Sequence, residues 1–151
     1  MTAAVDLAPL ERRLVAAVEV GEVVDLRGTG PAPVDAAEMD GWGAERAVRA
    51  EVVRDILLGR VGSGADPRGL RLCGARVVGT LDLEGVRIEM LLRLTECDFT
   101  DMVWVHGSQL QLLDLRGSRL RGLNGRELAV QRALLLGRVV AGHIGLVRHG
   151  R

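Results

Sequence analysis

The stretch GTLDLEGVRIEMLLRLTECDFT, residues 79–100, decides the fold of this chain. Its apolar or small residues come in pairs two positions apart, and the pairs recur every five or six residues: Leu81/Leu83, Val86/Ile88, Leu92/Leu94 and Cys97/Phe99. This spacing matches neither the period of an α-helix nor the simple alternation of a flat strand. It matches a chain that turns a corner after each pair and sends two side chains inward from each side.

The same pairs can be followed outward in both directions. They are Leu70/Leu72 and Ala75/Val77 before this stretch, and Val103/Val105, Ser108/Leu110, Leu113/Leu115, Ser118/Leu120, Leu123/Gly125 and Leu128/Val130 after it. Four such sides make a coil of about twenty residues, stacked on the next at about 4.8 Å. Residues 70–146 therefore predict about four coils. The expected fold is mainly β: a right-handed, parallel, quadrilateral β-solenoid with a small N-terminal α-helical region.

A leucine-rich repeat is the main alternative for this pattern. The stretch from Leu110 to Leu120 would pass for one such repeat. However, leucine-rich repeats recur at intervals of about 20–29 residues, with a helix or loop between their strands. Here the paired spacing fills the whole interval, which favours the solenoid.

Residues 1–69 are expected to form a helical cap region with a linker, and residues 70–151 the solenoid. Apolar spacing predicts a helix over about 7–20 and a second over about 40–58, the latter with Val48, Val52, Ile56 and Leu57 on its apolar face. A short strand is expected at 23–26. Together with Trp42, the apolar face of the second helix is expected to pack on the first coil, near Leu70 and Leu72.

The composition excludes several classes of protein. The chain has 151 residues, 20 basic and 20 acidic side chains, and two cysteines, which make no disulfide framework. No apolar run reaches membrane-spanning length and no secretory signal is visible, so a cytoplasmic protein without membrane insertion is expected. Residues 1–69 carry 12 acidic and 8 basic side chains, whereas residues 70–151 carry 8 and 12. The solenoid is therefore net basic.

The sequence contains no catalytic, metal-binding or cofactor-binding constellation that we would assign. Gly28-x-Gly30 and the Gly59–Gly64 segment lack the strand-then-helix context of a dinucleotide cradle. His106, His143 and His149 have no ligand spacing with a cysteine. Cys97 is expected in the core and Cys73 partly exposed, and neither has the partners of a nucleophile. We expect no cofactor and no enzyme activity.

Acidic residues lie near several predicted corners. Asp82, Glu84, Asp98 and Asp101 are expected on a solvated surface, with arginines in similar positions neutralising their field. The arginines at 116, 119, 121, 126 and 132 cluster in sequence, but almost no aromatic residue is present to stack on bases. Nucleic acid is therefore not expected as a partner.

The C-terminal end has the most suggestive surface of the chain. The candidate interface residues are Leu134, Leu135, Leu136, Val139, Val140, Ile144 and Leu146. This run is too apolar to be left in water, and the last coil of a solenoid presents unpaired backbone groups. Another chain, a swapped copy or further C-terminal sequence would cover it. We expect end-to-end self-association.

The repeats resemble the pentapeptide-repeat superfamily, most closely at Cys97-Asp98-Phe99-Thr100-Asp101 and at residues 118–122, SRLRG. Val103, Leu113 and the six-residue steps depart from its pattern. The whole chain is similar to a group of uncharacterised actinobacterial proteins, through the leader from Trp42 to Gly59 and repeats of the kind seen from Gly79 to Ile88. The resemblance implies the fold much better than a function.

The expected function is a non-catalytic interaction or scaffold module that self-associates and has an unknown protein partner. Some members of the superfamily imitate a DNA duplex and bind DNA gyrase, so gyrase binding is one alternative. It would need a surplus of acid, whereas this solenoid is net basic. The other alternative is an enzyme, because members of the actinobacterial group are sometimes labelled oxidoreductases. No motif in this chain supports that label.

Overall fold

The computed structural model describes residues 6–27 and 34–146. The helices are α1 (Pro9–Val20), α2 (Ala36–Met39) and α3 (Ala50–Leu57), with a 3-10 turn at Ala44–Arg46. The first eight strands are β1 (Val24–Asp25), β2 (Ala47–Arg49), β3 (Leu70–Cys73), β4 (Arg76–Val78), β5 (Leu81–Asp82), β6 (Arg87–Ile88), β7 (Leu92–Thr95) and β8 (Asp98–Phe99). They are followed by β9 (Val103–Trp104), β10 (Gln109–Asp114), β11 (Arg119–Leu120), β12 (Leu123–Asn124), β13 (Ala129–Leu135), β14 (Val140–Ala141) and β15 (Ile144–Gly145).

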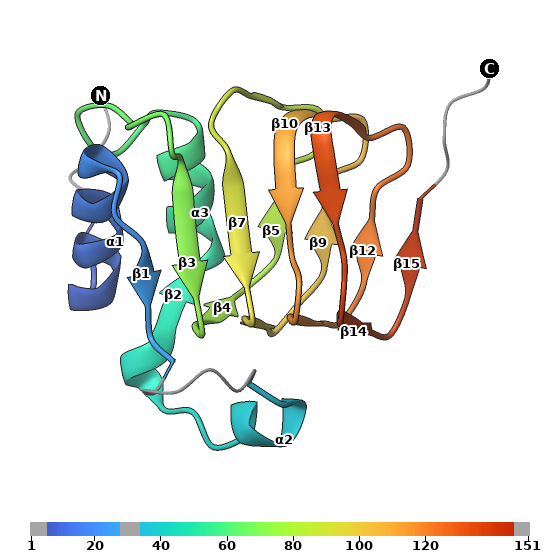
Figure 1. The fold of residues 1–151 in the computed structure, drawn as a ribbon, viewed down its shortest axis with the longest axis horizontal. Helices are drawn as coiled ribbons and strands as arrows, with labels where there is room; N and C mark the ends of the chain where they lie inside the picture. The colour runs from blue at the N-terminus through green and yellow to red at the C-terminus, as the bar shows by residue number, and fades with distance from the viewer. Residues whose placement is uncertain (1–5, 28–33, 147–151) are drawn as a thin grey trace.

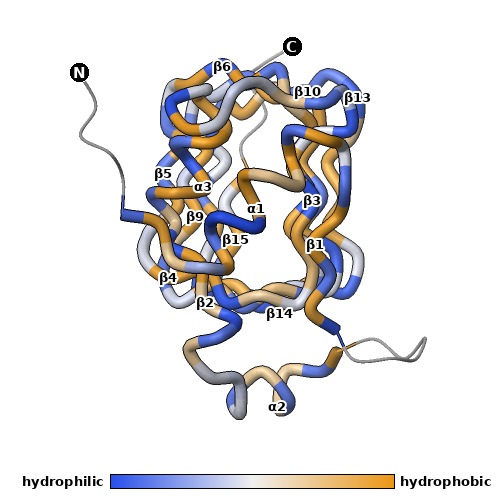
Figure 2. The backbone as a smooth tube through the Cα atoms, turned by 90° about the vertical axis from the view of Figure 1, so that its left-hand side faces the viewer, coloured by the Kyte–Doolittle hydropathy of each residue, from blue (hydrophilic) through white to orange (hydrophobic). Residues whose placement is uncertain are grey.

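The strands wind into a right-handed parallel β-solenoid, as the paired spacing predicts. Strands β3 and β7 run down the front in Figure 1, whereas β5 and β9 run up the back, and the coils advance from the N-terminal helices toward β15. Seen along the axis in Figure 2, the backbone outlines a square with four sides. All strand pairs in the three sheets are parallel.

The sheet registers give the length of each coil. On the first side, Leu70 pairs with Leu92, Leu92 with Leu113 and Leu113 with Leu134, so the steps are 22, 21 and 21 residues. The coils starting at Leu70, Leu92 and Leu113 are complete. The last one, from Leu134, has strands on only three sides before residue 146. The solenoid thus has about three full coils, fewer than the four expected from length alone.

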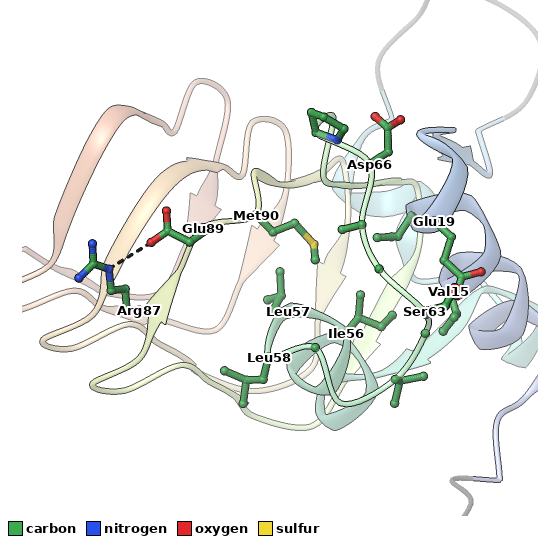
Figure 3. Close-up of a pocket in the computed structure, with 17 residues that line it drawn as sticks. Val15, Glu19, Ile56, Leu57, Leu58, Ser63, Asp66, Arg87, Glu89 and Met90 are labelled. Carbon is green, nitrogen blue, oxygen red and sulfur yellow. Dashed lines mark hydrogen bonds and ion pairs between the residues drawn. The ribbon is translucent and has the colours of Figure 1, made fainter.

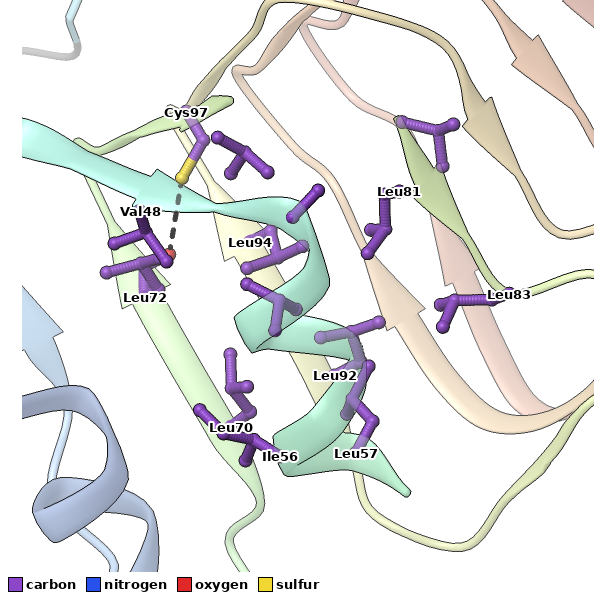
Figure 4. Close-up of a cluster of buried hydrophobic side chains, with 14 of the residues drawn as sticks. Val48, Ile56, Leu57, Leu70, Leu72, Leu81, Leu83, Leu92, Leu94 and Cys97 are labelled. Atoms are coloured by element: carbon purple, nitrogen blue, oxygen red, sulfur yellow. Dashed lines mark hydrogen bonds between the residues drawn. The ribbon is translucent and has the colours of Figure 1, made fainter. Parts of the chain in front are cut away.

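The inward register predicted from the pairs is confirmed. Most pair residues from Leu70 to Leu123 are buried, and the sides meet in one continuous apolar core with Phe99 as its only aromatic ring. Figure 4 shows this core at the first coils, where Leu70 and Leu92 from the first side and Leu81 from the third side lie beside α3. A narrow interior of this kind is filled by one medium-sized side chain per position, which explains how the chain folds with so few aromatic residues.

One corner of the square uses left-handed backbone throughout the solenoid. The corner after the first side has positive φ in every coil, at Gly74 (80°), Glu96 (50°), Gly117 (74°) and Arg138 (59°). Glycine meets this requirement without steric cost, whereas glutamate and arginine adopt it at some expense. Glycine therefore meets the backbone requirement in two coils, and in a third Glu96 accepts hydrogen bonds from Val34 and Arg27.

The N-terminal region extends the solenoid instead of lying apart from it. Strand β1 pairs with β3 on the first side and β2 pairs with β4 on the second. The helix predicted over 40–58 is wrong for its first ten residues, because Val48 occupies an inward strand position opposite Val77. Only α3, from Ala50, is helical there. The division of the chain into two domains at residue 69 stays a prediction.

Packing of the predicted apolar face on the first coil is confirmed. Val48, Val52, Ile56 and Leu57 are all buried in the core that contains Leu70 and Leu72. Helix α1 lies across the mouth of the square in Figure 2. Its residues Leu14 and Val18 are buried in the core. The N-terminal end of the solenoid is therefore closed by helices.

Candidate interaction surface

Strands β13, β14 and β15 form the C-terminal edge of the solenoid. Each pairs with the preceding coil, and none has a further strand beside it among residues 6–27 and 34–146. The Val140 N–H donates back to Ser118 O at 3.0 Å, and Gly145 O accepts from Gly125 N–H at 2.7 Å. Because backbone groups alternate between the two edges of a parallel strand, Ala141 and Ile144 direct theirs at the open edge.

All seven candidate interface residues lie in this last coil. Leu134, Leu135, Leu136 and Val139 are half-buried, whereas Val140, Ile144 and Leu146 are 57%, 38% and 42% exposed. In the preceding coils the equivalent inward positions, such as Leu113 and Leu123, are fully buried. The apolar interior of the solenoid thus opens to solvent at this end.

Val140 lies on the outer face of the second side, as Leu135 opposite Asp114 does on the first side. Its register partner is Arg119, whose own partner is Asp98, so these residues form an outward column on the second side, headed by Arg76. Ile144 instead pairs with the buried Leu123 and continues the interior. The sequence pattern identifies the apolar run, but the side of the coil on which each residue lies follows from the strand register.

The outward column contains a buried carboxylate, which corrects the expectation that Asp98 is solvated. Asp98 is 1% exposed. Arg76 Nε donates to its Oδ2 at 3.0 Å, and Arg119 Nε donates to its Oδ1 at 2.9 Å. Burial raises the pKa of Asp98, but the hydrogen bonds from Arg119 and Arg76 outweigh it and hold this pKa below its usual value.

The same two arginines hold the arm, residues 34–46, against the second side. Arg76 donates to the carbonyls of Met39 (2.6 Å) and Trp42 (2.9 Å). Arg119 donates to Ala36 O at 3.2 Å and pairs with Asp40 at 2.9 Å. Within the arm, the Met39 side chain is buried, and it lines a cavity of about 260 Å³ with Gly117 and Val140. The arm therefore reaches the side of the C-terminal coil.

Glu96 anchors the start of the arm. This buried corner residue accepts from Val34 N–H at 2.6 Å and from Arg27 Nη1 at 2.9 Å. Cys73 Sγ lies 3.8 Å from the same carboxylate. The expectation that Cys73 is partly exposed is wrong: its exposure is 7%, because it is packed beside Arg27 and Glu96.

Neither thiol is suited to nucleophilic chemistry. Burial raises the pKa of Cys73 to about 11 and that of Cys97 to about 12. A nucleophilic cysteine needs a depressed pKa and an accessible sulfur. Cys97 Sγ points into the core, 3.6 Å from Leu72 O, which confirms its expected core position.

The other candidate chemical groups stay dispersed. Within the two described segments, no three His, Cys, Asp or Glu side chains gather so as to hold a metal ion. His149 and the Gly28-x-Gly30 segment lie outside the described residues. The glycines from Gly59 to Gly64 follow α3 and precede no helix, so they form no dinucleotide cradle of the usual kind.

Asp82 and Glu84 lie at the surface, as expected. Asp98 and Glu96, however, are buried with arginine partners, and Asp114 is buried with Arg116 at 2.8 Å. Sequence reasoning missed these pairs because their partners are often distant along the chain. The recurrence of acids and arginines at about one coil length, as in Arg76, Asp98 and Arg119, was the available signal.

Every helix in the described part of the chain is too short or too polar to cross a membrane. Comparisons of the sequence with protein-family models and curated proteins, and of the fold with solved structures, found no match. The assignment of the chain therefore rests on its own geometry: a parallel β-solenoid closed by helices at one end and open at the other.

Proposed function

We propose that this protein is a non-catalytic interaction or scaffold module that associates with a second copy of itself through the C-terminal coil, residues 134–146. The observation that carries the proposal is the exposure of Ile144 and Leu146 beside three strands whose outer edges pair with no strand of the described segments. An open edge next to apolar surface favours pairing with another chain.

The contrast between the two ends supports this proposal. At the N-terminal end, α1 and α3 bury Leu14, Val18 and Ile56, and Glu11 is buried with Arg49 at 2.8 Å. At the C-terminal end, the described residues include no such cap. A second copy offers a coil of the same square outline, so it supplies strands on matching sides.

The structure adds little support to the two alternative functions, gyrase binding and oxidoreductase activity. A DNA mimic that binds gyrase needs an acidic field, yet Glu96, Asp98 and Asp114 are each neutralised by an arginine. An oxidoreductase needs a cofactor site, and the glycine segments supply no familiar one.

We also propose kinship with pentapeptide-repeat proteins and a cytoplasmic location. Coils of about 21 residues and the inward Cys97/Phe99 pair support the first. Two unpaired cysteines support the second, since disulfides are rare in the cytoplasm. The actinobacterial origin suggested by the sequence resemblance remains a proposal on the same footing.

Self-association is tested by sedimentation equilibrium over a hundredfold range of concentration. Wild type is expected to form dimers or larger assemblies, whereas the double variant Ile144→Arg, Leu146→Arg is expected to be monomeric. Both side chains are exposed, so the variant should keep the wild-type circular dichroism and melting temperature.

Val78→Arg is the matched control, because Val78 is equally exposed (40%) but lies on the second side, away from the open edge. This variant should associate like wild type. A wild-type chain that stays monomeric at every concentration would sink the proposal, as would equal association of the double variant.

A further inference from the structure

The partial coil that precedes Leu70 has three of its four sides filled. β1 supplies the first side, β2 the second and α3 the third. On the third side, Arg54 Nε donates to Asp82 O at 2.9 Å, so the helix covers the edge of β5. On the fourth side, β6 pairs with β10 and with no other strand among the described residues.

The free edge of β6 presents a backbone donor and a backbone acceptor. Gln109 N–H donates to Val86 O at 2.8 Å, with Gln109 in register with Arg87. In a parallel pair, the residues flanking Arg87 therefore bond to β10. The N–H and C=O of Arg87 point the other way, toward the N-terminal end.

A cavity of about 680 Å³ lies at this edge (Figure 3). Its walls come from α1, the end of α3, the loop 59–67 and Arg87 to Met90 of the first coil. Val15, Leu57, Val61 and Met90 make much of the lining apolar. The volume is in the usual range of about 300–1,000 Å³ for small-ligand sites.

The cavity carries a negative charge. Among its lining residues, Glu19, Asp66 and Glu89 are acidic and Arg87 alone is basic. Glu89 is paired with Arg87 at 3.1 Å. Glu19 accepts from Ser63 N–H at 2.6 Å and Asp66 from Arg68 N–H at 2.9 Å, and neither has an ion pair with a described residue. A cationic group would complement these two carboxylates.

We propose that this cavity binds a short extended peptide of alternating apolar and basic residues, which adds as a strand to the free edge of β6. Its backbone bonds to the N–H and C=O of Arg87, an apolar side chain enters the cavity, and a basic one lies near Glu19 or Asp66. Strand addition of this kind draws affinity from main-chain hydrogen bonds and specificity from the side-chain pocket. The site is at the opposite end from the C-terminal coil and is independent of self-association.

The test uses the full-length ¹⁵N-labelled chain and capped synthetic pentapeptides followed by NMR. The parent probe has the sequence acetyl-RVRVR-amide, and an acidic counterpart has the sequence acetyl-EVEVE-amide. The parent is expected to shift the amide signals of Arg87, Gly62 and Gly64, with at least tenfold higher affinity than the acidic probe.

Two further probes, N-methylated at the second or at the third residue, separate strand addition from simple apolar binding. Since alternate amides of a strand face its partner, one analogue should lose at least tenfold in affinity and the other should not. Equal binding of parent and both analogues would overturn the strand geometry. Shifts at Ala141 and Ile144 in place of Arg87 would overturn the site.

Variants of the protein complete the test. Val61→Trp, which fills the cavity, should abolish binding, and Glu19→Gln, which keeps the acceptor for Ser63, should weaken it severalfold. The double variant Ile144→Arg, Leu146→Arg should bind like wild type. If Glu19→Gln and Val61→Trp both bind with wild-type affinity, the proposed site is wrong.

Discussion

Asp98 is a carboxylate removed from water and held by two arginines from neighbouring coils. Taking a charge out of water is costly, so the pair geometry must recover that cost through hydrogen bonds. Here both carboxylate oxygens are used, at 2.9 and 3.0 Å. Because its partners also donate to the arm, Asp98 links the stability of the solenoid to the position of residues 34–46.

We expect Asp98→Asn to lower the free energy of unfolding by about 2 kcal/mol at pH 7. This loss is smaller than the loss expected for a fully buried ion pair, because Arg76 and Arg119 keep some solvent contact. The folded-state pKa of Asp98 is depressed, so its contribution is present above the unfolded value of about 3.9 and is lost as the pH falls through the lower folded value. Urea unfolding of both proteins between pH 7 and pH 2 measures this difference. The exposed Glu84→Gln serves as control, and a gap between wild type and Asp98→Asn that persists at the lowest pH would contradict the account.

The burial of residues on the inner face could be predicted, whereas the burial of some corner and outward residues could not. Cys97 is buried because it falls on the inward period, which is visible in the sequence. Cys73 and Asp98 fall on corner or outward positions, and they are buried by segments that precede residue 70. Arg27 lies 69 residues before Glu96, and no local pattern reports such a contact.

Among the elements, β2 and α3 show where local pattern and tertiary context disagree. The residues from Ala47 to Leu57 have apolar side chains at both strand and helix spacing. Pairing with β4 makes Ala47–Arg49 a strand, because the exposed backbone groups at the edge of β4 pair with an extended segment. The helix from Ala50 then fits the third side, where Val53 and Ile56 fill the mouth of the core. The apolar face was predictable; the change from strand to helix was not.

The arm is held mainly by arginine contacts and by two buried side chains, Met39 and Trp42, so it should open separately from the solenoid. Met39→Asp places a carboxylate in the buried contact of α2. We expect hydrogen exchange of the amides in 36–46 to quicken at least tenfold, while β8 and β11 stay protected. Ala37→Asp, at an exposed position of the same helix, should leave exchange unchanged. Loss of protection throughout the chain would show that the arm and the coils unfold as one.

At the scale of the whole molecule, the coils form a one-dimensional stack. Each coil contacts its neighbours, so its stability depends on being covered on both sides. The central coils are covered and the N-terminal end is closed by α1 and α3, whereas residues up to 146 cover only one face of the last coil. The square cross-section follows from the paired spacing. Whether an end of the solenoid is covered by helices depends on residues outside that repeat.

The cost of an inward charge should therefore depend on the position of its coil. Leu94 is fully buried between Leu72 and the following coil, so Leu94→Asp puts an unpaired carboxylate in a dry interior. We expect a loss of about 4 kcal/mol or more, enough to unfold the solenoid. Ile144→Asp occupies an inward position of the open last coil and is already 38% exposed, so the monomer should lose less than about 1 kcal/mol. Val78→Asp, outward on β4, should be nearly neutral. Thermal melts of the three variants followed by circular dichroism rank these effects, and a wild-type melting temperature for Leu94→Asp would show that the inward register is wrong.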